Sequence, residues 1–238
     1  VRVYLKKNIG YGRAVNFAAK KVKTKFFFVI NPDAIINKKT LNNLIIIASK
    51  IKKFGAIGPV YENHRKKYKK KVIEVNKLVS AAMLINKNTF LKLKGYDDNY
   101  FLYYEDDDFF LKCKSNNLKL FLVTNSLIKH KKTKTVRKTL NLHSTTFSNF
   151  KERNSTYLVG GWHGQWSKFY FFKKNYGYIV ALRKCLPNNL VNIFQIILFI
   201  FFNPTKSKYK YFKFEGFLCS LFGLPAFKRS LYDNQNLY

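Results

Sequence analysis

Four consecutive acidic side chains, at positions 105–108, are the first candidates for chemistry in this sequence. The 238-residue chain has twelve acidic residues against forty-five lysines and arginines, and six of the twelve fall between positions 97 and 108. Apolar and aromatic residues flank the run at 101–104 and 109–111. Such flanks indicate partial burial, which raises the pKa of a carboxyl group toward the range that suits a general base.

The acidic run is predicted to open a helix that ends near Asn116, and the helix dipole favours carboxylates in its first turn. On such a helix Glu105 and Asp108 share a face while Asp106 points elsewhere, so the acids cannot all have one role. A structural interpretation stays open, in which these are capping and first-turn acids and Asp108 pairs with Lys112 four residues later.

Two further residues are candidate metal ligands. Asp33 follows a predicted buried strand, at the strand end where ligands collect in open α/β sheets. His130 ends another predicted strand. A carboxylate and an imidazole, together with substrate phosphates, suit Mg²⁺ or Mn²⁺, although a structural role for a lone histidine is the alternative. We expect the acidic run to fold inward and face both residues across one cleft.

The elements that would position these residues alternate along the first half of the chain. The apolar run "KFFFVI" at 25–30 predicts a strand, residues 40–51 show helical spacing, and "GAIGPV" at 55–60 predicts a second strand. This order is typical of a βαβ unit and a parallel sheet. Further strands are predicted at 77–85, 118–123 and 126–130, and a short helix ends near Gly95.

After residue 135 the chain changes to long aromatic and basic segments, so we predict domains at 1–135 and 136–238. The segment 186–204 has an apolar core of about a dozen residues, shorter than the roughly 20 residues that span a bilayer. Lysines interleaved with aromatic residues around it favour helices in a membrane interface. An ordinary helical subdomain that buries those rings is the alternative.

Composition narrows the classes of function. The net charge of +33 favours an anionic partner such as nucleic acid, a membrane surface or a phosphorylated substrate. The three cysteines show no ligand spacing, which argues against a zinc site or a disulfide framework and favours a reducing compartment. No signal segment is seen, and no nucleic-acid-binding motif accompanies the charge, so nucleic acid is not expected as a partner.

Several of these segments together resemble a known family. They are the N-x-G-x-x-x-A-x-N pattern at 8–16, "NPDA" at 31–34, "GYDDNYFLYYEDDD" at 95–108 and the histidine at 130. In this order they resemble glycosyltransferase family 2, in its rhamnosyltransferase-like branch of inverting GT-A enzymes. The resemblance covers residues 8–130, and it lacks the first strand and helix units that members of the family ordinarily carry.

The resemblance implies a role for each candidate residue. Asp106 would be the general base that deprotonates the acceptor hydroxyl, with Glu105 and Asp108 shaping its surroundings. Asp33 and His130 would hold the divalent cation, Mg²⁺ or Mn²⁺. The donor nucleotide would be bound by residues of the N-terminal half: Asn8, Gly10, Arg13, Asn16 and Asn31.

The implied fold is α/β and GT-A-like (Rossmann-like), with a mostly parallel sheet, flanking helices, a truncated N-terminus and a mainly helical C-terminal extension. The implied activity is that of a bacterial, metal-dependent inverting glycosyltransferase of cell wall or polysaccharide biosynthesis. It would move a sugar from a nucleotide-diphosphate donor to a polyprenyl-diphosphate-linked or surface glycan, at the inner face of the cell membrane. The alternative is a catalytically impaired, truncated remnant that acts only as a membrane-associated binding protein.

Overall fold

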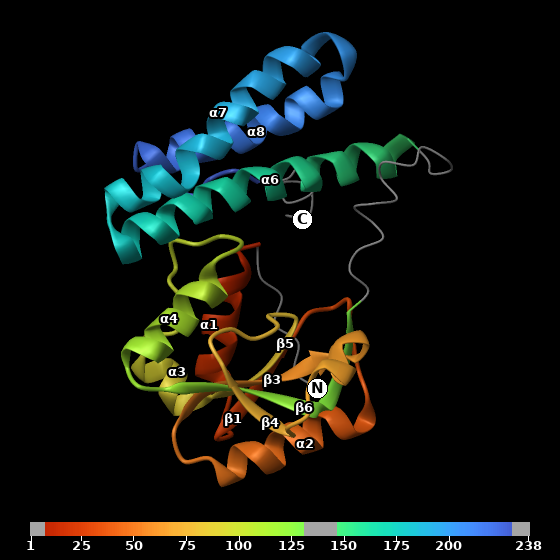
Figure 1. Cartoon of the computed structure of the whole chain (residues 1–238), viewed down its shortest axis with the longest axis vertical. Coiled ribbons are helices and arrows are strands. Elements are labelled where there is room, and N and C mark those ends of the chain that lie inside the picture. The colour runs from red at the N-terminus through yellow and green to blue at the C-terminus, as the bar shows by residue number, and fades with distance from the viewer. Residues whose placement is uncertain (1–7, 131–146, 230–238) are drawn as a thin grey trace. The chain divides into compact units, whose positions relative to one another are not determined.

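The computed structural model of the chain describes residues 8–130 and 147–229 (Figure 1). By their internal contacts they form two compact units. The sheet unit combines Ala14–Asp97 with Asp106–Lys134, and the helical unit combines Val1–Arg13, Asp98–Glu105 and Thr135–Tyr238. The two units are described separately below.

The sheet unit is built on a six-stranded sheet with the order β1-β5-β3-β6-β2, in which β4 also pairs with β6. The strands are β1 (Phe26–Ile30), β2 (Ala34–Ile36), β3 (Phe54–Tyr61), β4 (Val72–Val75), β5 (Ala82–Asn86) and β6 (Lys119–His130). The strand predicted at 25–30 and that at 55–60 are confirmed as β1 and β3. The two strands predicted at 118–123 and 126–130 are instead one continuous strand, β6, whose register against β3 shifts between Pro59 and Val60.

The sheet is mixed, so the prediction of a mostly parallel sheet was wrong. β3 and β6 are parallel, whereas β5 runs antiparallel to both β1 and β3 and separates them. β1 and β3 therefore share a direction, as a βαβ unit requires, without being neighbours. Strand β5 could not be placed from its own sequence because a short apolar run carries no direction.

Helix α2 (Lys38–Lys50) forms because Asn37 caps it and an apolar face recurs along it. The Asn37 side chain accepts from the N–H of Lys39 at 2.8 Å. Leu44 and Ala48 of α2 pack in one buried cluster with side chains from three strands of the sheet, Phe54, Ile57, Leu84 and Val123. This cluster is the core that fixes the sheet beneath the candidate site.

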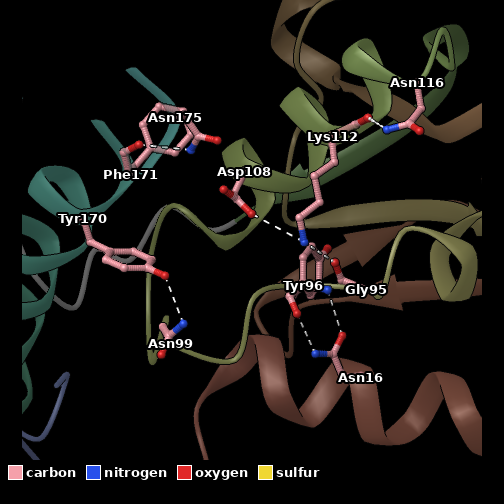
Figure 2. A network of polar contacts seen from close by, with 10 residues as sticks. All are labelled: Asn16, Gly95, Tyr96, Asn99, Asp108, Lys112, Asn116, Tyr170, Phe171 and Asn175. Carbon is pink, nitrogen blue, oxygen red and sulfur yellow. Dashed lines mark hydrogen bonds and ion pairs between the residues drawn. The ribbon is translucent and has the colours of Figure 1, made fainter. Parts of the chain in front are cut away.

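Helices α1 (Tyr11–Lys21) and α3 (Lys87–Lys92) meet the segment around Gly95. Gly95 follows α3 with φ +62°, and its N–H donates to the carbonyl of Phe90 at 2.8 Å, as expected for a residue that ends a helix. The side-chain amide of Asn16 brackets the next residue, donating to Tyr96 O and accepting from Tyr96 N, both at 2.9 Å (Figure 2). The left-handed turn at Gly95 thus aims Tyr96 into the core, where it is 2% exposed.

Helices also form the body of the helical unit, as expected for the C-terminal extension. They are α6 (Phe147–Tyr176), α7 (Tyr178–Phe202) and α8 (Pro204–Leu221). Gly177, with φ +89°, separates α6 from α7, and Asn203 caps α8 by accepting from the N–H of Lys206 at 3.0 Å. Side chains from all three helices meet in a buried cluster: Phe169, Ala181, Cys185 and Phe217.

The segment Asp98–Glu105 belongs to the helical unit and is held against α6. The Ser167 hydroxyl donates to Leu102 O at 2.8 Å. Asn99 donates to the Tyr170 hydroxyl at 3.0 Å, as Figure 2 shows. Tyr103 and Tyr104 both have positive φ, +70° and +67°. Two consecutive left-handed residues other than glycine store backbone strain, which commonly accompanies functional segments.

Helix α7 is longer than its apolar core suggested. Its 25 residues continue through Pro187, with a mean hydropathy of 1.8 over the most apolar window, of which 17% is buried. By length and composition α7 could cross a membrane, so the expectation that this segment is too short was wrong. The sequence estimate failed because helical residues on both sides of the apolar core add to its length.

Gly95 offers a test of this architecture. A Cβ at this position would overlap the Asn16 Oδ1 that holds Tyr96, and it would place an alanine in the left-handed region. We expect Gly95→Ala to lower the free energy of unfolding by about 2 kcal/mol or more, measured by urea denaturation. Gly164→Ala in α6 is the matched control, because the nearest atom to its new Cβ lies 3.9 Å away. It should be neutral or stabilising by up to about 1 kcal/mol, and equal effects of the two changes would contradict the account.

Candidate functional site

Three strands of the sheet run in the same direction and end at the same edge. β1 ends at Ile30, β3 at Tyr61 and β6 at His130. β5 runs the other way and starts at this edge, since Ala82 pairs with Ile30. The carboxyl ends of like-directed strands are where ligands bind in open α/β sheets, so this edge is the candidate site.

The "NPDA" motif forms a tight turn at this edge. The N–H of Ala34 donates to Asn31 O at 3.0 Å, with Pro32 at the second position that turns favour. The N–H of Asn31 donates to Ala81 O at 2.9 Å, which ties the turn to the start of β5. Asp33 is half-buried, and its charge together with burial raises the pKa of Tyr61, with burial the larger cause. Asp33 and the end of β3 therefore lie close together.

The second predicted metal ligand reaches the same place through its backbone. β2 pairs antiparallel with β6, and Ala34 is the register partner of His130. His130 therefore lies opposite the residue that follows Asp33, while its side chain lies outside the described part of the structure. Residues 8–130 and 147–229 contain no group of three metal-binding side chains. A cation here would have the Asp33 carboxylate as its described protein ligand, which fits hard ions that complete their shell with substrate phosphates and water.

The three aspartates that open α4 (Glu105–Ser115) have different surroundings. Asp107 forms an ion pair with Lys77. Asp108 is fully buried and pairs with Lys112, with 3.6 Å between Oδ2 and Nζ, as the structural interpretation of this run expected. The same lysine donates to Gly95 O at 2.9 Å, so Asp108 helps to hold α4 against the Gly95 turn (Figure 2).

Asp106 is buried without a cationic partner among the described residues. Its side chain is 8% exposed, and its Oδ1 is buried with no hydrogen-bond partner there. Burial raises the pKa of Asp106 from 3.8 to about 6, against the smaller lowering effect of the Tyr96 and Ser80 side chains. The charge of Asp107 adds a further rise. At neutral pH this carboxylate is ionised and has a pKa that suits proton transfer.

Two consecutive residues connect Asp106 with the Asp33 turn. The Ser80 side chain lowers the pKa of the Asp106 carboxyl group and so lies close to it, while the carbonyl of the next residue, Ala81, accepts from Asn31 N–H. Ala81 and Ala82 are buried against Ala34 and Tyr61 at the strand ends. The sheet unit thus brings Asp106, Ser80 and the turn that contains Asp33 to one edge from three separate parts of the sequence.

Glu105 and the residues predicted to bind the donor nucleotide contact nearby parts of the chain. Glu105 is 5% exposed, and its charge, after the larger effect of burial, raises the pKa of Tyr103. Asn8 accepts from the N–H of Gly10 at 3.1 Å, and Arg13 Nε donates to Asp98 O at 2.7 Å. The amide of Asn16 is engaged with Tyr96 as described above. These contacts support the local fold, and donor binding by Asn8, Gly10, Arg13, Asn16 and Asn31 stays a prediction.

Comparison with protein-family models finds a match in the middle of the chain. A family model described as the N-terminal domain of galactosyltransferase matches residues 63–138, about a third of the chain. No curated protein matches the sequence. The match indicates a glycosyltransferase-type domain. It contains Ser80, Tyr96 and the acidic run, whereas Asp33 and the segment at 8–16 lie outside it. It does not distinguish the rhamnosyltransferase-like branch of family 2.

Sequence reasoning missed three residues of this candidate site. Ser80 and Tyr96 flank Asp106, and Tyr61 lies beside Asp33. Tyr96 stands in the "GYDD" part of a motif that was already recognised, so its position was an available signal. Ser80 and Tyr61 carry no such signal, because only the pairing of β5 with its neighbours brings them to the edge.

The burial of Asp106 predicts an effect on stability with a definite sign. Its pKa is higher in the folded chain, so between pH 3.8 and about 6 the folded state keeps a proton that the unfolded state has lost. Stability therefore falls as pH rises through this window, by about 3 kcal/mol, and stays reduced above it. Asp106→Asn should abolish the decline and raise the free energy of unfolding at pH 7 by up to about 3 kcal/mol, as measured by urea denaturation.

Asp107→Asn is the matched control, because this neighbour is 29% exposed and ion-paired with Lys77. It should keep the decline and change stability by less than about 1 kcal/mol. A decline that persists in Asp106→Asn would contradict the assigned pKa.

Proposed function

We propose that the protein is an inverting glycosyltransferase in which Asp106 is the general base. It would transfer a sugar from a nucleotide-diphosphate donor to a hydroxyl group of a lipid-linked or surface glycan. The observation that carries this proposal is the buried Asp106 carboxylate, which has a raised pKa. The consecutive residues Ser80 and Ala81 connect it with the turn that contains Asp33. The match over residues 63–138 supports the glycosyltransferase class.

In the proposed reaction the acceptor hydroxyl gives its proton to Asp106. The acceptor oxygen forms a bond to the anomeric carbon while the bond from that carbon to the diphosphate oxygen breaks, which inverts the configuration. Since the pKa of Asp106 is about 6, the carboxylate is ionised at neutral pH yet basic enough to share the proton as charge develops on the acceptor. Ser80 and Tyr96 would hold the carboxylate in place.

A divalent cation, when bound, would neutralise charge on the departing diphosphate. Asp33 and His130 would hold it, supported by the proximity of their backbones across the β2–β6 pair. Asn31 would occupy the first position of the metal motif, where many relatives of the resembled family have aspartate. The half-buried carboxylate of Asp33 would supply the charged ligand.

For the transferred sugar we propose only a chemical class. The resemblance at residues 8–130 implies a rhamnosyl group, and the description of the matching family names a galactosyl group. Both are hexose units carried on nucleotide diphosphates, and a substrate panel should include UDP-galactose and dTDP-rhamnose. A lipid-linked acceptor would place the protein at the cytoplasmic face of a bacterial cell membrane.

Activity provides the test of the base. With the active donor of that panel, Asp106→Asn should lower kcat by about 10²- to 10⁴-fold with little change in KM, because binding does not require proton transfer. The wild-type rate should fall as pH drops through about 6, where Asp106 becomes protonated. Asp107→Asn is the control and should keep a rate near that of the wild type at neutral pH, with a pH profile shifted slightly to lower pH because the Asp107 charge contributes to the raised pKa of Asp106. Transfer at the normal rate by Asp106→Asn would contradict the assignment.

Calorimetry with UDP and with dTDP, each in the presence of Mn²⁺, tests the metal ligand and separates an enzyme from a binding remnant. The wild-type chain should give saturable heat that depends on Mn²⁺, and Asp33→Asn should weaken the metal-dependent affinity by at least about tenfold. Glu62→Gln is the control, because Glu62 pairs with Lys129 beside the same strand ends. Absence of saturable heat in the wild type would favour the remnant, and equal affinity in Asp33→Asn would remove Asp33 from the metal site.

A further inference from the structure

Helix α7 of the helical unit exposes a continuous apolar face. Exposed side chains recur along it at helical spacing: Ile179, Leu186, Leu190, Phe194, Ile197 and Phe201. Exposure rises toward the C-terminal end, where Phe201 and Phe202 are 85% and 82% exposed. A stripe of this length on a described helix is far larger than the scattered apolar residues that ordinary surfaces carry.

The opposite face of α7 is already occupied within the helical unit. Ala181 and Cys185 pack in the cluster with Phe169 and Phe217. Further along, Asn189 donates to Cys185 O at 2.8 Å and Asn192 donates to Asn189 Oδ1 at 3.2 Å, both fully or nearly buried. The side chains inside the unit include these polar groups, whereas the outward stripe is apolar. α7 is therefore fixed in rotation with its apolar face turned away from α6 and α8.

Cations border this stripe. Lys206, in the first turn of α8, lies over the ring of Phe199 with Nζ 4.0 Å from its centroid. Lys210 lies one helical turn after Lys206 on the same face of α8, and α7 and the first turns of α8 contain no acidic residue. Burial, followed by the charge of Lys206, lowers the pKa of Lys210. An anionic surface would relieve the repulsion between these lysines.

The position of α8 decides between crossing a bilayer and lying on it. At 1.5 Å per residue α7 is about 37 Å long, enough to cross the roughly 30 Å hydrocarbon core. α8 runs back alongside it, however, since the Ser207 hydroxyl donates to Ile196 O at 3.0 Å. A crossing α7 would take Lys206, Lys208 and Lys210 into hydrocarbon, which is strongly unfavourable. A helix lying in the interface buries one face by about 5–10 Å and leaves such lysines among the headgroups.

We propose that the apolar face of α7 lies in the interface of an anionic lipid bilayer, parallel to its plane, with the lysines of α8 on lipid phosphates. This proposal rests on the membrane location given under Proposed function. It adds which surface of the protein binds the membrane, how α7 is oriented there and which class of lipid it meets. It rests only on that location, because no step of sugar transfer enters the argument.

Vesicle flotation of the full chain tests the proposal. With phosphatidylcholine vesicles that contain 30% phosphatidylglycerol, about tenfold tighter binding is expected than with phosphatidylcholine alone, and high salt should weaken it. The triple change Phe194→Ser, Ile197→Ser and Phe201→Ser should weaken binding to the anionic vesicles at least about tenfold. Lys206→Gln with Lys210→Gln should reduce binding to the anionic vesicles toward the level of neutral vesicles.

Ile45→Ser with Ile46→Ser is the matched control, because these α2 residues are also exposed, at 41% and 51%, on the sheet unit. It should bind as the wild type does, and circular dichroism should confirm that every variant keeps its helix content. Asp106→Asn should also bind normally, which separates a failure of this surface from a failure of the proposed activity.

Three results would overturn the proposal. Equal binding of the wild type to neutral and anionic vesicles would remove the role of the lysines. Retention in the membrane after alkaline carbonate extraction would mean that α7 crosses the bilayer. A concentration-dependent dimer in light scattering that the Phe194, Ile197 and Phe201 changes abolish, without vesicle binding, would mean that a second copy of the chain covers the stripe.

Discussion

The central constraint in this structure is the Asp106 carboxylate, which is buried with no cationic partner in the described part of a strongly cationic chain. Asp107 and Asp108, its neighbours in sequence, each pair with a lysine, whereas the side chains of Tyr96 and Ser80 only partly offset the effect of burial on Asp106. Burial therefore raises its pKa to about 6 instead of being offset by a charge. Such a group is unfavourable for stability at neutral pH, and its chemical use as a base would explain why it is there.

The surrounding fold serves to place this group. Asp108 and Lys112 join α4 to the Gly95 turn, and that turn together with Asn16 aims Tyr96 toward the core. Strand β5 begins at Ala82, directly after the two residues that contact Asp106 and the Asn31 turn. The antiparallel β5, which makes the sheet mixed, is therefore also the element that brings the Asp106 and Asp33 carboxylates to one edge.

The sequence predicted the parts of the fold whose signals are local. Apolar runs predicted the positions of β1 and β3. The preference of glycine for helix ends predicted the turn at Gly95, and the four-residue spacing predicted the ion pair between Asp108 and Lys112. Strand direction and pairing depend on contacts between distant segments, so the order of the sheet and the role of Ser80 could not be predicted. The length of α7 was underestimated because composition alone does not show that Asn192 and Gln195 lie within one continuous helix.

The pKa of Asp106 in solution is the most direct test of the account. Nuclear magnetic resonance of the chain labelled with ¹³C at the aspartate carboxyl groups would follow each signal with pH, and Asp106→Asn would assign the signal that disappears. The account predicts a midpoint near 6 for Asp106. A midpoint at about 4 or below, the range of a solvated or cation-paired aspartate, would contradict the claim that this carboxylate is held buried and poised to accept a proton.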